Sequence, residues 1–275
     1  MAAPAARSAV RPRARGGAQA LTAAVLAALA GLQGAASARV IPRSVLPGLG
    51  PGSARVTVEA ERPPWRGVVR VQTEVGQHCS GALVGPRLVL TAAHCVFGRG
   101  TGQLVRPGSV HVLAGYSHGD YAGHARATSL EIGPGFALGA DQQRASSAPV
   151  DADWAVLTLD APLGTADRVL PLQRELPSPG TPAMLGGYEQ DRAQVIFADT
   201  ACAVVGPVRD PSGRVLLRHS CSGTRGVSGA PLLARKPGGS WAVVGLASSA
   251  AVGTSGGYAV PVAAITSDAL AALLR

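Results

Sequence analysis

Three residues with distinctive local contexts could together carry out nucleophilic chemistry. The first is His94, which follows the apolar run Leu88-Val89-Leu90 within Thr91-Ala92-Ala93-His94-Cys95. An imidazole can accept and return a proton near neutral pH, so His94 is a candidate general base. Such a base needs a nucleophile and an orienting carboxylate, and suitable residues of both kinds occur downstream.

The candidate nucleophile is Ser228, within Gly226-Val227-Ser228-Gly229-Ala230-Pro231-Leu232. Flanking glycines allow a sharp turn that exposes a serine hydroxyl, and they let backbone N–H groups face a reacting carbonyl. Cys221 lies shortly upstream and could fix this loop. A plain Gly-Ser turn between two strands is the alternative interpretation.

The candidate carboxylate is Asp153, which begins the run Asp153-Trp154-Ala155-Val156-Leu157-Thr158-Leu159. An acid that enters a hydrophobic strand can be buried and directed at a histidine. It would then fix the tautomer of the imidazole and stabilise the imidazolium. Asp151 precedes the same run and is a rival, and a solvated turn residue is the alternative interpretation.

Four cysteines, Cys79, Cys95, Cys202 and Cys221, predict two disulfides in an exported chain. Three pairings are possible. The local pairing closes two loops of roughly 15 to 20 residues, each contributing about 3 kcal/mol in the chain-entropy model. A zinc site is the alternative, but the cysteines lack the C-x-x-C spacing typical of one.

Residues 1–38 are expected to form a signal peptide. Four arginines without any acid come first, the short apolar stretch 21–32 follows, and Ala36-Ser37-Ala38 is a small-residue cleavage site. An N-terminal membrane anchor is the alternative. We therefore expect a secreted or periplasmic protein with no stable membrane association after signal removal.

Composition indicates a folded protein with a core of Val, Leu and Ala, because 47% of residues are hydrophobic but only 4% are aromatic. The formal net charge is +9, and the four arginines of the expected signal leave +5 for the rest. The arginines are scattered and form no basic run interleaved with aromatics, so we expect no nucleic-acid partner. We also expect a monomer.

Short apolar runs separated by turn signals predict an all-β fold, since the chain holds 36 glycines and 21 prolines. Helical structure is expected for one turn at 92–96 and for a C-terminal helix at 267–274, where Thr266, Ser267 or Asp268 could cap the first turn. Residues 117–149 are expected to form long surface loops. The expected strands are 67–71, 81–84, 88–90, 110–114, 155–159, 183–185, 194–197, 201–205, 215–217, 230–233, 242–246 and 258–262.

The order His94, Asp153, Ser228 and the three motifs resemble the chymotrypsin/trypsin-like serine protease family over roughly residues 65–275. The histidine motif matches without change. The aspartate motif resembles the family's Asp-Ile-Ala-Leu-Leu and favours Asp153 over Asp151. The serine motif resembles Gly-Asp-Ser-Gly-Gly-Pro with two changes.

The resemblance implies an exported serine endopeptidase that cleaves a peptide or protein substrate through an acyl-enzyme, with no metal or cofactor. The backbone N–H groups of Gly226 and Ser228 would hold the oxyanion. A catalytically inactive relative that binds a partner through the same cleft is the main alternative. A β-sandwich adhesin without protease activity is a third.

The implied fold is two six-stranded antiparallel β-barrels with a short C-terminal helix and the site in the cleft between them. Residues 39–64 would form an N-terminal arm or pro-segment, 65–165 the first barrel, and 166–275 the second barrel and the helix. A Cys79–Cys95 bridge matches the family's disulfide beside the histidine. A Cys202–Cys221 bridge is more similar to the bacterial secreted branch, which includes the glutamyl endopeptidases.

By the same resemblance, Ser222 would lie at the base of the substrate pocket, Ser248 and Ala250 on one wall, and Gly256 on another. The absence of an acid at the base disfavours Arg or Lys at P1. Ala247 falls where glutamyl endopeptidases carry a histidine, which disfavours Glu. An apolar P1 residue is therefore expected.

Val227 departs from the family pattern. Pancreatic-type enzymes carry an aspartate at this place, which pairs with a new N-terminal ammonium after cleavage. Valine cannot form that salt bridge, so we expect the protein to become active without burying a freshly cut N-terminus.

Overall fold

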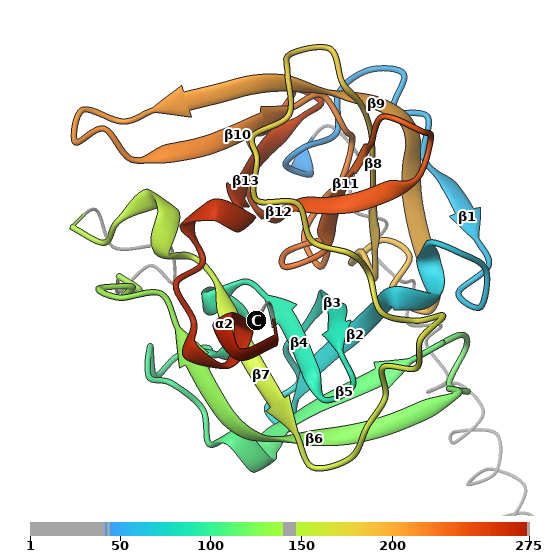
Figure 1. Cartoon of the computed structure of the whole chain (residues 1–275), viewed down its shortest axis with the longest axis vertical. Helices are drawn as coiled ribbons and strands as arrows, with labels where there is room; N and C mark the ends of the chain where they lie inside the picture. The colour runs from blue at the N-terminus through green and yellow to red at the C-terminus, as the bar shows by residue number, and fades with distance from the viewer. Residues whose placement is uncertain (1–41, 43–44, 140–146, 274–275) are drawn as a thin grey trace, which may run out of the picture. The chain divides into compact units, whose positions relative to one another are not determined.

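The computed structural model describes residues 42, 45–139 and 147–273, and these contain the two barrels expected from the sequence. The signal peptide expected at 1–38 lies outside the described residues. All strand pairs are antiparallel, and the two barrels occupy the upper and lower halves of Figure 1. The predicted fold class, all-β with two six-stranded barrels and a short C-terminal helix, is confirmed.

The first barrel closes in the strand order β2-β3-β4-β7-β6-β5. Most residues of its strands are buried, except along β6. Its strands are β2 Val68–Thr73, β3 His78–Gly85, β4 Leu88–Thr91, β5 Val110–Ala114, β6 Gly123–Ile132 and β7 Ala155–Leu159.

The second barrel follows the order β9-β10-β13-β12-β11-β8, and the β8–β9 pairing closes it. The short strand β1 (Val56–Val58) pairs with β9 outside this ring. The barrel strands are β8 Pro182–Gly187, β9 Ile196–Arg209, β10 Val215–His219, β11 Pro231–Arg235, β12 Trp241–Ser249 and β13 Gly257–Pro261.

The expectation of surface loops across residues 117–149 was wrong for its central part. Strand β6 lies there and pairs with both β5 and β7, so the first barrel could not close without it. Only Ala125 and Ala127 of this strand are fully buried, and its other side chains are polar or partly exposed. Two alanines give a weak apolar alternation, which explains why the sequence pattern concealed the strand.

The expected strands at 194–197 and 201–205 are parts of one long strand, β9. The polar residues Asp199 and Thr200 interrupt the apolar pattern, but the backbone continues through them. Asp199 itself is buried and accepts hydrogen bonds from the N–H groups of Ala201 and Ser222. A buried carboxylate with two donors is compatible with a strand interior.

The chain ends in helix α2 (Asp268–Leu273), which contacts β7 of the first barrel. Among the three candidates, Ser267 provides the cap, because its Oγ accepts the N–H of Leu270 at 3.2 Å. Glu131 of β6 accepts both the Ser267 hydroxyl at 2.6 Å and the Asp268 N–H at 3.0 Å. These bonds tie the end of the second half of the chain to the first barrel. The single turn expected at 92–96 is also present, as the 3-10 helix η3 (Ala93–Val96).

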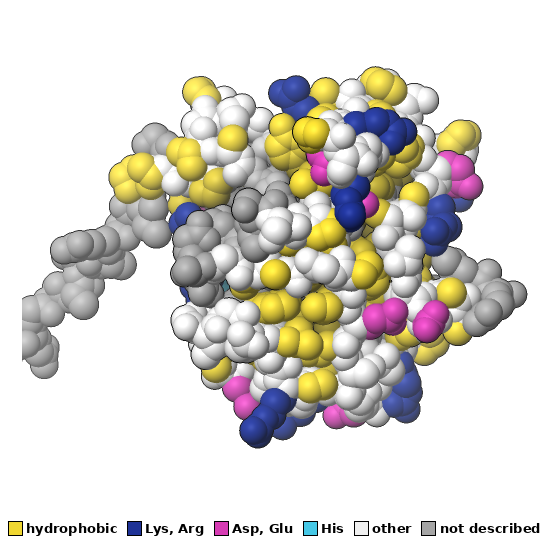
Figure 2. Space-filling view, turned by 90° about the vertical axis from the view of Figure 1, so that its left-hand side faces the viewer, with side chains coloured by type: hydrophobic (Ala, Val, Ile, Leu, Met, Phe, Trp, Pro, Cys, Tyr) yellow, Lys and Arg dark blue, Asp and Glu magenta, His cyan; other side chains and the backbone are white. Residues whose placement is uncertain are grey.

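Buried side chains of both barrels form one continuous cluster, which includes Val68 and Leu90 of the first barrel with Leu233 and Val260 of the second. Burial of this shared apolar surface fixes how the two barrels meet. On the face shown in Figure 2, basic and acidic side chains are spread among apolar and uncharged surface. Within the described ranges, no helix has the length and apolar character needed to cross a bilayer.

Candidate active site

His94 is carried by the short helix η3, directly after β4 ends at Thr91. A disulfide joins Cys95 to Cys79 of β3, so the residue next to the histidine is bonded to the neighbouring strand. The Thr91 hydroxyl donates to the Ser80 carbonyl at 2.7 Å and fixes the end of β4. The backbone around His94 is therefore held on both sides.

Asp153 lies just before β7 with its side chain only 4% exposed, and it faces His94. Its Oδ2 is 2.9 Å from His94 Nδ1, and its Oδ1 accepts the His94 backbone N–H at 3.0 Å. Ser248 of β12 donates its hydroxyl to Oδ2 at 2.6 Å. Asp151, the rival acid, instead pairs with Arg214 at 3.1 Å, away from the histidine.

The electrostatics of this pair favour an ionised Asp153. Burial acts to lower the pKa of His94, but the charge of Asp153 and its hydrogen bond outweigh burial and raise that pKa above its ordinary value of 6.5. Burial acts to raise the pKa of Asp153, but the charge of His94 and the hydrogen bonds from His94 and Ser248 keep it below its ordinary value. The carboxylate thus remains charged and favours the protonated form of the neighbouring imidazole.

Ser228 lies on the loop before β11, and this loop contacts the first barrel. The Ser228 carbonyl accepts the N–H of Ser80 at 2.9 Å. Gly226 and Gly229 have φ values of +95° and +77°, and a Cβ at Gly226 would lie 2.3 Å from the Tyr188 carbonyl oxygen. Both positions therefore require glycine. Among the bonds of the described residues, no backbone carbonyl accepts the N–H of Gly226 or Ser228.

A cavity of about 860 Å³ brings these residues together, because His94, Asp153, Gly226 and Ser228 all line it. Three of the four expected substrate-pocket residues, Ser248, Ala250 and Gly256, line the same cavity.

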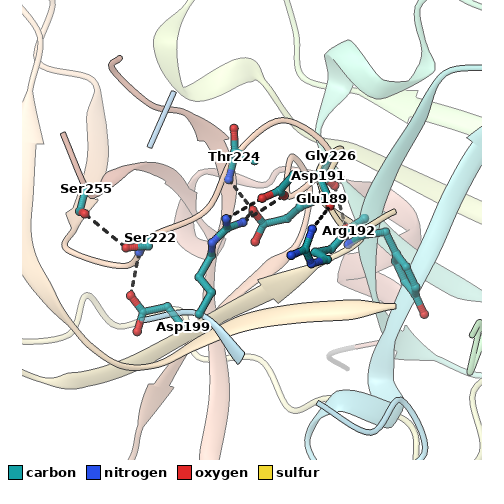
Figure 3. Close-up of polar contacts among 11 residues, drawn as sticks. Glu189, Asp191, Arg192, Asp199, Ser222, Thr224, Gly226 and Ser255 are labelled. Atoms are coloured by element: carbon teal, nitrogen blue, oxygen red, sulfur yellow. Dashed lines mark hydrogen bonds and ion pairs between the residues drawn. The ribbon is translucent and has the colours of Figure 1, made fainter. Parts of the chain in front are cut away.

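Ser222 was expected at the base of the substrate pocket. It is 3% exposed and does not line the cavity. Its backbone N–H donates to Asp199 Oδ2 at 2.8 Å, and its hydroxyl lies 3.3 Å from that of Ser255 (Figure 3). The buried carboxylate of Asp199 fixes this part of the backbone, and no local signal in the sequence indicated that contact.

His219 lines the cavity and was missed by sequence reasoning. It ends β10, is 4% exposed, and burial lowers its pKa to about 4, so its imidazole is neutral near pH 7. In the sequence, His219 is a single histidine at the end of a short apolar run, and nothing in that pattern indicates that it lines a cavity.

A second missed group is a cluster next to the loop that carries Ser228, formed by Arg55, Glu189, Asp191 and Thr224. Figure 3 labels the last three of these residues. The Arg55 guanidinium contacts the Glu189 carboxylate and donates to Asp191 Oδ2 at 2.8 Å. Glu189 also accepts the Thr224 N–H at 2.8 Å. Arg55 stands in the segment expected only to be an arm or pro-segment, so nothing in the sequence paired it with residues far along the chain.

The four cysteines form the local pairs Cys79–Cys95 and Cys202–Cys221. The sulfur atoms of Cys79 and Cys95 lie close to the His94 ring and could resemble a metal site by distance alone. Because the two sulfurs are bonded to each other, neither offers a thiolate to a metal.

The model of the Trypsin family matches residues 54–270. This match covers most of the chain, so the chain belongs to the trypsin family and is a serine endopeptidase by class. A solved Glu endopeptidase is similar in fold, with 18% identity and a TM-score of 0.62 over 78% of this chain and 94% of that one. The Rv3671c protease in an inactive form has 19% identity and a TM-score of 0.50 over 72% and 84% of the two chains.

Proposed function

We propose that this protein is an exported serine endopeptidase whose catalytic residues are Ser228, His94 and Asp153. The observation that carries the proposal is the buried Asp153–His94 pair beside the cavity that Ser228 also lines. Asp153 would hold the imidazole with its proton on Nδ1, which leaves Nε2 free to act as a base.

In the proposed reaction, Ser228 Oγ attacks the scissile carbonyl while His94 Nε2 takes the hydroxyl proton. The backbone N–H groups of Gly226 and Ser228 donate to the oxyanion, and their freedom from carbonyl partners within the described chain supports this role. His94 then passes its proton to the leaving amine, and water hydrolyses the acyl-enzyme by the reverse roles.

Export is proposed from the sequence of residues 1–38 together with the two disulfides, because disulfides persist in oxidising compartments. A peptide substrate with an apolar P1 side chain remains the proposed specificity. Of the described residues that line the cavity, the only acid is Asp153, which already binds His94 and Ser248.

The test is labelling by a serine-reactive peptidyl phosphonate, followed by mass spectrometry of the tryptic peptides. We expect one adduct at Ser228, and none in Ser228→Ala or in protein unfolded before labelling. Peptide hydrolysis should vanish in the same variant with little change in thermal midpoint, since one small turn residue replaces another. Folded wild-type protein that neither labels nor hydrolyses would support the inactive binding protein instead.

A further inference from the structure

The guanidinium of Arg55 is a buried cation behind the serine loop, which comprises residues 222–229. It lies just before β1, and its side chain is 1% exposed. Its partners are the side chains of Glu189, which is 0% exposed, and Asp191, which is 23% exposed. Figure 3 labels Glu189 and Asp191, whose carboxylates both accept hydrogen bonds from this guanidinium. A charge removed from water to this extent is tolerated only when it is paired.

Glu189 connects this cation to the serine loop. Its Oε2 accepts the backbone N–H of Thr224 at 2.8 Å, two residues before Gly226. The next residue, Gln190, donates its N–H to the Arg225 carbonyl at 2.7 Å. The segment 188–190 is therefore hydrogen-bonded to the segment 224–226, which contains Gly226, one of the two residues whose N–H groups are assigned to the oxyanion.

The environment makes Glu189 dependent on Arg55. Burial acts to raise the pKa of Glu189, whereas the charge of Arg55 and the hydrogen bond from the Thr224 N–H act to lower it and so favour the carboxylate. Asp191 adds a second negative charge nearby. Without the guanidinium, nothing charged would offset the burial of this carboxylate, which favours its protonation or its movement toward solvent, and either change would disturb the contact with the serine loop.

The serine loop has no carboxylate of its own to pair with a cation. Val227 stands beside Ser228, is 8% exposed, and packs in an apolar cluster with Leu185 and Ala230. The buried anion, Glu189, and the buried cation, Arg55, both belong to other segments of the chain. Arg55 and Glu189 are separated by 134 positions in the sequence.

We infer that Arg55 is a positioning residue that, through Glu189, holds the serine loop in the conformation in which its N–H groups can receive the oxyanion. The guanidinium of Arg55 would thus order the serine loop, a role that a newly cut N-terminal ammonium cannot fill here because Val227 offers it no carboxylate. The catalytic consequence rests on the proposed function of Ser228, whereas the ordering of the loop does not.

The first experiment measures loop order without using activity. Hydrogen–deuterium exchange of peptides covering 222–229 is compared in wild type, Arg55→Met and Arg168→Met. Arg168 is a matched control, because its guanidinium is 15% exposed and pairs with Glu61 away from the serine loop. We expect at least roughly tenfold faster exchange of this segment in Arg55→Met only. Equal exchange in the two folded variants would overturn the inference.

The second experiment measures catalysis and phosphonate labelling. Loss of one oxyanion donor typically lowers kcat by about 10²–10³. We expect Arg55→Met to lose at least about tenfold in kcat with a much smaller change in KM and an unchanged acidic limb of the pH profile. Arg168→Met should stay within about twofold of wild type. A folded Arg55→Met enzyme with wild-type kcat would overturn the inference.

Two further variants cover the case in which Arg55→Met does not fold. Arg55→Lys keeps the positive charge but cannot contact both carboxylates as the planar guanidinium does, so it should lie between wild type and Arg55→Met in both measurements. Glu189→Gln keeps an acceptor for Thr224 N–H, and combined with Arg55→Met it should restore most of the slow exchange. An Arg55→Lys variant equal to wild type in both assays would contradict the inference. An inactive wild type with Arg55-dependent exchange would overturn the proposed catalysis but leave the loop ordering intact.

Discussion

Replacement of Asp153 by Asn should remove most of the activity while leaving the barrel intact. Oδ1 accepts the His94 backbone N–H, and Oδ2 accepts both His94 Nδ1 and the Ser248 hydroxyl. An amide has one oxygen and one NH₂ group. An NH₂ in the place of Oδ1 would set a donor against the His94 backbone N–H, so the favoured orientation puts the NH₂ in the place of Oδ2, against His94 Nδ1. The imidazole is then driven toward the tautomer with its proton on Nε2, which cannot act as the base.

The size of the effect follows from the separation of the charges. An imidazolium and a carboxylate 2.9 Å apart interact by about 6 kcal/mol at an effective dielectric constant of about 20. At about 1.36 kcal/mol for each tenfold change in rate, this corresponds to a loss of roughly 10⁴ in kcat. The effect of the wrong tautomer should not be added to this loss, because the tautomer change and the lost charge are two descriptions of the same failure to form the ion pair.

The pH profile provides a second readout with a defined sign. The proposed mechanism requires neutral His94, so kcat/KM should fall as the pH drops through the pKa of His94, which Asp153 raises above 6.5. In Asp153→Asn the raising charge is gone while burial and Arg99 still lower that pKa. The acidic limb should therefore move to lower pH.

The assay is steady-state hydrolysis of a peptide ester and a peptide amide from pH 5 to 9, with thermal midpoints measured in parallel. Asp151→Asn is the matched control, because it is the same substitution two positions away. Among the described residues, Asp151 pairs only with Arg214. It should retain activity within about twofold. A folded Asp153→Asn protein that loses less than about tenfold, or keeps its acidic limb, would refute the assignment of Asp153.

Three other expected outcomes concern the serine loop, the substrate and the N-terminus. Gly226→Ala should destabilise the fold and abolish activity, because its Cβ would clash with the Tyr188 carbonyl, whereas Gly213→Ala, with φ +83° and open space, should cost only about 1–2 kcal/mol in a urea titration. In a series of peptides that differ only at P1, apolar residues should give a higher kcat/KM than Arg or Lys, and a preference for the basic residues would contradict the pocket assignment. Proteins that begin at Arg39 with and without an added Met should differ by less than about threefold in activity, since Val227 cannot pair with a new ammonium. A decrease near a hundredfold would show that the N-terminus is part of the switch.

The sequence predicted the features that depend on short stretches of chain. His94, Asp153 and Ser228 each occur in a local motif, and the apolar runs located most barrel strands within a few residues. Strand β6 was missed because its inward positions are alanines, which give little contrast with polar neighbours. Burial of such a strand is decided by the strands on either side of it rather than by its own residues.

Contacts between distant segments could not be predicted in the same way. Ser248 meets Asp153 across 95 positions, and Arg55 meets Glu189 across 134. The local sequence around Arg55 and around Glu189 does not differ from that around an arginine or glutamate on the solvated surface. Their pairing exists only because closure of the second barrel and addition of β1 to β9 bring the two segments together.

The geometry of the site depends on the docking of the two barrels, and Ser80 of β3 shows how. Its hydroxyl donates to the Gly226 carbonyl at 2.8 Å and accepts the Tyr188 N–H at 2.8 Å, while its backbone N–H donates to the Ser228 carbonyl. Ser80 is fully buried, so each bond replaces one to water only after the barrels have met. The serine loop of the second barrel is thus bonded to the strand whose neighbouring residue, Cys79, is joined to the residue after His94. The proposed base, His94, and the proposed nucleophile, Ser228, are therefore held by the same few residues of one strand. An error in barrel docking would displace them relative to each other before it disturbed either barrel alone.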